Sequence, residues 1–249
     1  MTQTLDRPAG AAPDAGIPAT LYESRVVLPA DAAQALRAVS DPAMRLSADL
    51  YAHRMIWTLF AGAAEARRPG LFQFQVERDR PFTAIVRSSL PPQDALGAWQ
   101  ITTRPFAPIL EPGRRLRFRL QAVASRWRTE PGRKRGRRHD VIAAAWRDLA
   151  DPDAEPALLE ATAERAARDW LVRQGERCGF ACTRIAVLDY DRRRLPGKDR
   201  GRPIAFGAIT YEGELTVGDD VAAFRRMLAE GLGDSRAYGF GLMQIAPAG

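Results

Sequence analysis

The chain has 249 residues, 46% hydrophobic and 27% charged, a composition typical of folded globular proteins. No apolar run approaches the roughly 18 residues that a transmembrane helix needs, and the first 20 residues lack the apolar segment of a signal peptide. We therefore expect a cytoplasmic protein without membrane contact, in which the Pro- and Ala-rich residues 1–18 form a disordered extension.

The first hundred residues predict a strand, two helices and two further strands. Strands are expected at 21–28, 71–77 and 83–88, and helices at 30–39 and 47–60, the second stopping by Gly70. Residues 94–99 fit either a short strand or a turn. This unit, residues 19–97, is the predicted N-terminal domain.

Residues 98–249 predict a second unit with a similar element order. Strands are expected at 115–124, 180–188, 204–211, 214–217 and 242–245, with Gly213 as a bulge or turn, and helical segments at 139–150, 160–178 and 219–230. Two successive units of this kind indicate an α+β protein built from two β-α-β-β-α-β sandwiches.

Two short stretches concentrate the positive charge of a chain whose net charge is +7. Residues 126–139 hold seven Lys or Arg and one Glu, and residues 191–202 hold six Lys or Arg and two Asp, so the remaining residues sum to −3. Basic stretches on a slightly acidic body are typical of proteins that bind polyanions. The alternative is a pair of solvated basic loops without a partner.

The helix predicted at 47–60, SADLYAHRMIWTLF, carries one of only two histidines. His53 falls in an apolar row with Leu50 and Trp57 at spacings of three and four. A histidine exchanges protons near neutral pH, so His53 is a candidate for proton transfer; a half-buried structural histidine is the alternative. Cys178 and Cys182 are the only cysteines and fit free thiols better than a zinc site.

A glycine-rich segment, GLGDSRAYGFGLMQ, spans residues 231–244. Gly231, Gly233, Gly239 and Gly241 permit backbone conformations that other residues avoid, and Arg236 adds a charge. The segment lacks the P-loop pattern and follows a helix, which argues against a nucleotide cofactor.

The ending GxG-x4-YGFGL resembles the glycine-rich loop of the CRISPR repeat-processing endoribonucleases. The chain is similar to their CasE subfamily, which serves the type I-E (Cascade) system, in the ordered segments LYESRVVLP, YAHRMIWTLF, FQFQVERD, RFRLQAVASRW, KRGRRHDV, WLVRQGERCGF and AITYEGEL. This similarity covers about residues 20–247.

The resemblance implies two tandem ferredoxin-like (RRM-like) domains and cleavage of precursor CRISPR RNA at the 3′ base of each repeat hairpin. It implies a reaction without metal or other cofactor, in which the 2′-OH attacks the adjacent phosphate and leaves 2′,3′-cyclic phosphate and 5′-OH ends. The implied partners are the repeat hairpin, as precursor and as mature crRNA, and the other Cascade subunits, with which the enzyme stays bound.

The resemblance also implies a catalytic residue. The family's histidine lies in a Y-x-x-H-R pattern on the first helix, and His53 followed by Arg54 matches it. The family's tyrosine position is Leu50 here, whereas Tyr51 lies two residues before His53 and would face away from it on a regular helix. Tyr51 is thus either a catalytic or a packing residue.

Basic residues supply the predicted RNA contacts. Lys198 is the candidate partner of the scissile phosphate, with Arg200 and Arg202 as alternatives. The expected RNA-binding residues are Arg54, Arg126, Arg128, Arg133, Lys134, Arg135, Arg137, Arg138, Arg165, Arg168, Arg173, Arg200, Arg202 and Arg236. Two other functions stay open: a non-catalytic RNA-binding module, and a structural Cascade subunit that has lost catalysis.

Overall fold

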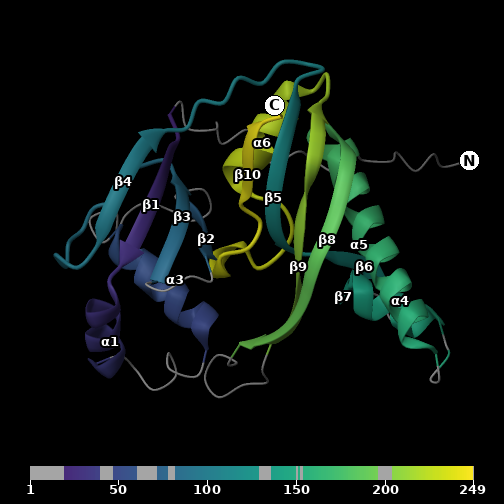
Figure 1. Ribbon diagram of the computed structural model, residues 1–249, viewed down its shortest axis with the longest axis horizontal. Coiled ribbons are helices and arrows are strands. Elements are labelled where there is room, and N and C mark those ends of the chain that lie inside the picture. Colours follow the sequence, from purple (N-terminus) through teal and green to yellow (C-terminus); the bar gives the residue numbers. More distant parts are fainter. Residues whose placement is uncertain are drawn as a thin grey trace, which may run out of the picture.

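The computed structural model describes residues 20–39, 47–60, 72–77, 82–128, 136–149, 151, 154–195 and 204–248. Its two four-stranded antiparallel sheets lie side by side, with the C-terminal glycine-rich segment between them (Figure 1). The predicted N-terminal extension and the predicted helix end at Gly70 lie outside the described residues. None of the described helices combines the length and the apolar character needed to cross a membrane.

The first sheet has the strand order β2-β3-β1-β4. Its strands are β1 (Tyr22–Leu28), β2 (Phe72–Glu77), β3 (Phe82–Ser88) and β4 (Gln100–Pro105), and the helices α1 (Ala30–Val39) and α3 (Ala48–Thr58) separate β1 from β2. The order is that of a ferredoxin-like sheet, and the strands and helices predicted before residue 90 are confirmed.

The segment between β3 and β4 departs from the predicted pattern. Residues 89–99 contain no helix, whereas the β-α-β-β-α-β pattern has one there, and the turn, one of the two alternatives for residues 94–99, is confirmed. The Asp94 carboxylate stabilises that turn by accepting hydrogen bonds from the backbone N–H of Ala98 (3.1 Å) and Trp99 (2.9 Å). Strand β4 follows and pairs with β1, so the first sheet extends past the boundary predicted at residue 97. The prediction failed there because β4 is largely exposed and carries no apolar alternation.

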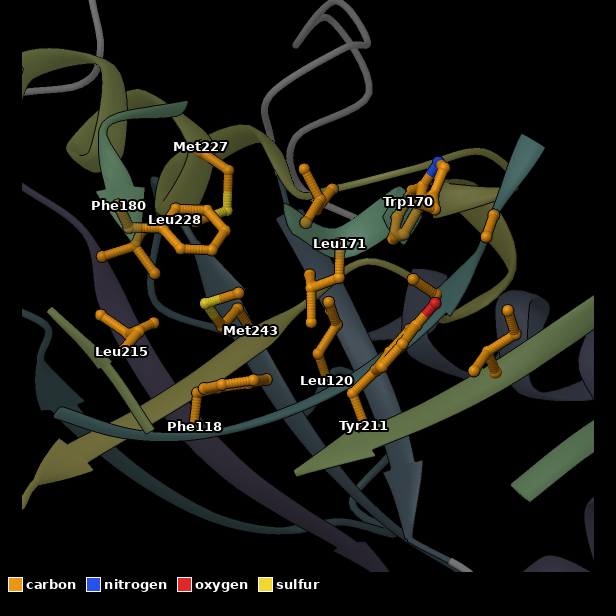
Figure 2. Close-up of a cluster of buried hydrophobic side chains, with 14 of the residues drawn as sticks. Phe118, Leu120, Trp170, Leu171, Phe180, Tyr211, Leu215, Met227, Leu228 and Met243 are labelled. Atoms are coloured by element: carbon orange, nitrogen blue, oxygen red, sulfur yellow. The ribbon is translucent and has the colours of Figure 1, made fainter. Parts of the chain in front are cut away.

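The second sheet has the order β10-β5-β9-β8. Its strands are β5 (Arg115–Val123), β8 (Phe180–Leu195), β9 (Ile204–Val217) and β10 (Met243–Pro247). Side chains from α5 (Pro156–Cys178), α6 (Val221–Glu230) and one face of the sheet form the core, where Trp170 and Leu171 meet Tyr211 (Figure 2). The alternation predicted for β5 is confirmed, because its arginines are exposed and Leu116, Phe118 and Leu120 are buried.

Two details of this domain differ from the sequence prediction. Strand β9 is continuous through Gly213, where two strands with a break were predicted; the register shifts fall in β8 instead. A Cβ at Gly213 would collide with the Arg184 carbonyl, so the glycine permits close strand approach rather than a turn. Residues at both ends of the first basic stretch form the strands of a hairpin, β6 (Ser125–Arg128) and β7 (Arg137–Asp140), which leads into α4 (Val141–Leu149).

A buried arginine joins the two domains. Arg87 on β3 donates hydrogen bonds to the carbonyl oxygens of Leu228 (3.0 Å) on α6 and Met243 (3.1 Å) on β10, and pairs with Glu23 at 2.7 Å. Burial alone would raise the pKa of Glu23, but Arg87 and Arg104 outweigh burial and lower it. These contacts fix the first sheet against α6, and so fix α3 beside the glycine-rich segment.

Candidate functional site

Helix α3 presents His53 at the edge of the N-terminal core. The helix begins after Ser47, whose Oγ accepts a hydrogen bond from the Leu50 N–H at 3.3 Å. Its buried side chains are Tyr51, Ala52, Met55 and Ile56. The predicted apolar row of Leu50, His53 and Trp57 is only half-buried and lies at the edge of the core, against which Trp57 packs. His53 lies beside the core and remains accessible.

The backbone of the glycine-rich segment holds the His53 ring. His53 Nδ1 hydrogen-bonds the carbonyl oxygen of Ala237, and the ring centroid lies 5.4 Å from that of Tyr238 and 6.4 Å from that of Trp57. A carbonyl oxygen can only accept, so Nδ1 carries the proton. In the neutral ring the lone pair is then on Nε2, which becomes the nitrogen that can exchange a proton.

The glycines of this segment allow it to reach His53. Gly231, Gly233, Gly239 and Gly241 all have φ between 84° and 92°, which confirms the unusual backbone predicted for them. The segment closes on itself through Leu232 N–H to Gly241 O (2.9 Å) and is pinned to β5 through Gly241 N–H to Gln121 O (2.7 Å). Its short helix η3 (Arg236–Tyr238) therefore lies against α3 at a defined position.

The two arginines beside His53 have different surroundings. Arg54 is exposed on α3. Arg236 donates from its guanidinium to the carbonyl oxygen of Glu230 at 2.8 Å, which ties the last turn of α6 to η3. Arg236 thus makes a structural contact with α6, and the side chains of Arg54 and Arg236 both remain accessible to a ligand.

Tyr51 packs into the N-terminal core and is 2% exposed. Its hydroxyl donates to the carbonyl oxygen of Ala33 at 3.3 Å, its ring meets Phe82 edge-on, and Arg37 lies 4.7 Å from the ring centroid. Burial raises the pKa of Tyr51, which keeps the phenol protonated at neutral pH. These are the contacts of a packing residue.

The β6–β7 hairpin carries four of the arginines predicted to bind RNA. Arg126 pairs with Asp148 at 2.6 Å, Arg128 pairs with the same carboxylate, and hydrogen bonds from both lower the pKa of Asp148. Arg138 pairs with Asp234 of the glycine-rich segment, and Arg137 is exposed. The hairpin is thereby fastened to α4 and to the segment that holds His53.

Helix α5 adds three further predicted arginines. Arg165 and Arg173 line a cavity of about 320 Å³ together with Arg126. Arg168 pairs with Glu164 one turn earlier, at 2.6 Å. The structure thus gathers Arg126, Arg165 and Arg173 in one place. The predicted residues Arg133, Lys134, Arg135, Lys198, Arg200 and Arg202 lie outside the described residues.

The sequence reasoning missed an ion pair between the domains. Arg193 on β8 pairs with Asp49 in the first turn of α3. Both residues line a cleft of about 630 Å³ between the domains, which Tyr51 and Gly239 also line. Only the position of Asp49, one turn before His53, could have drawn attention to the pair. Among the described residues, no three His, Cys, Asp or Glu side chains form a cluster that could hold a metal ion.

Comparison with known proteins gives a family match over most of the chain. The model of the family described as CRISPR associated protein matches residues 21–247. The CRISPR-associated endoribonuclease Cse3 of Thermus thermophilus is 31% identical over 154 residues, which are 58% of this chain and 61% of that relative. The matched part is thus less than two thirds of that relative's length.

Solved structures share the fold. A structure of the CRISPR endoribonuclease Cse3 bound to a 19-nucleotide RNA superposes with a TM-score of 0.65 at 23% identity, covering 92% of this chain and 100% of that one. A chain of a CRISPR RNA-guided surveillance complex superposes with a TM-score of 0.57 at 18% identity, covering 91% and 100%. The predicted fold class, α+β with two tandem ferredoxin-like domains, is confirmed.

Proposed function

The chain belongs to the CRISPR associated protein family, and from this premise we propose that it is an endoribonuclease that processes precursor CRISPR RNA at its repeat hairpins. The observation that carries the proposal is the contact between His53 Nδ1 and the Ala237 carbonyl. It presents a histidine of fixed tautomer at an accessible edge, next to a glycine-rich segment. The similarity to an endoribonuclease, and to one with RNA bound, supports the same conclusion.

The proposed reaction is an in-line transesterification without metal. The 2′-OH of the scissile nucleotide loses its proton and attacks the adjacent phosphate; the P–O5′ bond breaks and the 5′-oxygen gains a proton. The products carry a 2′,3′-cyclic phosphate and a 5′-OH. His53 Nε2 supplies one of the two proton transfers, a role that typically accelerates a reaction by about 10²–10⁴-fold. Lys198, with Arg200 and Arg202 as alternatives, is proposed to stabilise the charge on the phosphate.

The proposed RNA-binding surface of the protein is arginine-rich, and several of its arginines are paired with aspartates. A-form RNA hides its base edges in a deep major groove, so a hairpin stem is recognised by its shape and phosphates. Arg126, Arg128 and Arg138 each pair with an aspartate, and RNA phosphates would compete with those carboxylates. Exposed ion pairs contribute little to stability, so RNA phosphates can replace these carboxylates at small cost.

The enzyme is proposed to keep its product. Cleavage at the 3′ base of the hairpin leaves the stem intact, so contacts to the stem survive the reaction. The structural match to a chain of a surveillance complex is consistent with an enzyme that stays on the crRNA as a Cascade subunit.

A non-catalytic RNA-binding subunit is the second candidate. The observation that favours it is the packing of Tyr51, whose hydroxyl is engaged by the Ala33 carbonyl and not aimed at His53. If the reaction required a tyrosine hydroxyl near His53, this protein would bind the repeat RNA without cleaving it.

The deciding experiment is incubation of the protein with the host's repeat RNA in EDTA. We expect one cut at the 3′ base of the hairpin, and a 3′ fragment that a 5′ kinase labels without prior phosphatase treatment. Binding without cleavage under any condition would support the non-catalytic subunit, and cleavage that strictly requires Mg²⁺ would overturn the proposed chemistry.

A further inference from the structure

Arg193 lies where three parts of the molecule meet. It belongs to β8 of the second domain, and its guanidinium pairs with Asp49 of α3. The same guanidinium lies 5.4 Å from the ring centroid of Phe240 in the glycine-rich segment, and its Nε bonds Asp191 at 3.1 Å. The side chains of Arg193 and Asp49 are only 22% and 14% exposed. A planar guanidinium can bond carboxylates at its edge while its face meets an aromatic ring.

These contacts connect Arg193 to both elements that hold His53, namely α3 and the glycine-rich segment. Asp49 is one helical turn before His53, about 6 Å along the α3 axis. Phe240 is three residues after Ala237, whose carbonyl oxygen accepts the hydrogen bond from His53. Arg193 therefore links the helix that carries the histidine to the segment that orients it.

Removal of Arg193 would do more than delete one bond. The Asp49 carboxylate, only 14% exposed, would lose the cation that pairs with it and would keep the repulsion from the more exposed carboxylate of Asp191. An unpaired carboxylate at the low exposure of Asp49, repelled by Asp191, favours separation of α3 from β8. A small displacement of α3 would change the distance between His53 and Ala237.

We propose that Arg193 is a positioning residue for the cleavage reaction, which through Asp49 and Phe240 keeps His53 on the Ala237 carbonyl. This rests on the proposed function. Arg193 need not touch the RNA, because its guanidinium already contacts α3, the glycine-rich segment and Asp191.

The first test measures the tautomer of His53 by NMR spectroscopy in the absence of RNA. The chain has only two histidines, so ¹⁵N-labelled imidazole spectra contain one signal set for His53 and one for His139. We expect His53 in the Nδ1–H tautomer in the unaltered protein. Arg193→Gln shifts the His53 signals or mixes the tautomers and leaves those of His139 in place. An unchanged His53 spectrum in Arg193→Gln overturns the proposal, whether or not the protein cleaves RNA.

The second test separates positioning from RNA contact. In single-turnover cleavage at saturating protein, Arg193→Gln and Asp49→Asn each lower the rate about 10- to 100-fold, as misplacement of a reacting group does, while the Kd for uncleaved repeat RNA changes less than about twofold. The double variant is no slower than the slower single variant, because both changes break one link. Arg193→Lys keeps the positive charge but lacks the planar guanidinium with its several N–H donors. We expect it to recover part of the cleavage rate that Arg193→Gln loses.

Arg25→Gln is the matched control, since Arg25 is an exposed arginine on β1, away from these contacts, and we expect no change. A Kd that rises in step with the rate loss shows Arg193 to be an RNA contact and overturns the proposal. If Arg193→Gln does not fold, Asp49→Asn and Arg193→Lys give the same comparison. A wild-type protein that binds RNA without cleaving it contradicts the proposed function, and the imidazole spectra still decide the role of Arg193.

Discussion

A backbone carbonyl orients the His53 ring. The Ala237 carbonyl fixes the tautomer and has no proton to exchange, so proton transfer falls to Nε2. The apolar spacing around His53 predicted its helix. It could not predict the partner, which is 184 residues away in sequence and contributes only its backbone. Any residue type supplies the same carbonyl, so position 237 carries no sequence signal.

At the residue scale, Tyr51→Phe tests the role of the buried phenol. Loss of the hydroxyl removes the 3.3 Å hydrogen bond to Ala33 O and leaves the ring packing in place. We expect a loss of about 1 kcal/mol in the free energy of unfolding and a cleavage rate within about twofold of the wild type. Urea unfolding and single-turnover cleavage measure the two effects. A rate loss of tenfold or more with intact RNA binding would make Tyr51 catalytic after all.

The glycine-rich segment is the element on which the site depends. Its composition predicted backbone conformations reserved for glycine, and the positive φ values confirm this. Its contact with α3 was not predictable, because that contact requires the two domains to be packed together. For the other elements, periodic sequence patterns predicted most helices and strands. The exposed strand β4 and the continuity of β9 were not predicted.

At the element scale, Gly239→Ala and Gly113→Ala make a matched pair. Both glycines have positive φ, 90° and 83°, but a Cβ at Gly239 would lie 2.8 Å from the Phe74 ring, whereas one at Gly113 meets nothing within 4 Å. Gly113→Ala is expected to cost about 1 kcal/mol of stability through backbone strain alone. Gly239→Ala is expected to lower the stability by more than this. It should also lower the cleavage rate at least about tenfold, because the added Cβ forces the backbone next to η3 away from Phe74. Equal effects of the two changes on cleavage would show that the segment does not position His53.

The whole molecule depends on the packing of its two sheets, and Arg87 is the buried charge at that junction. It contacts Glu23 within its own domain and two carbonyl oxygens of the other domain. In the sequence, Arg87 is the one charged residue of β3, and nothing in its local pattern predicts that it is buried. Its burial follows from its contacts with α6 and β10 of the second domain, which lies beside the first sheet (Figure 1).

At the scale of the molecule, Arg87→Met is compared with Arg104→Met. Both arginines pair with Glu23 at 2.7 Å, but the Arg87 side chain is 0% exposed and that of Arg104 is 76% exposed. Arg87→Met is expected to lower the free energy of unfolding by about 3 kcal/mol or more, because it also strips two buried carbonyl groups of their donor. Arg104→Met costs less than about 1 kcal/mol. Denaturant unfolding measures both, and similar losses would mean that the junction does not stabilise the protein.

The central claim is that His53 transfers a proton in an attack by the RNA's own 2′-OH. The most direct measurement is single-turnover cleavage in EDTA of two repeat RNAs that differ only by a 2′-deoxy group at the scissile nucleotide, with wild-type protein and with His53→Ala. The wild type is predicted to cleave the all-ribose RNA and to bind the 2′-deoxy RNA equally tightly without cutting it. His53→Ala is predicted to bind both RNAs normally and to cleave the all-ribose RNA at least about 10²-fold more slowly. Cleavage of the 2′-deoxy RNA, or an undiminished rate in His53→Ala, would contradict the account.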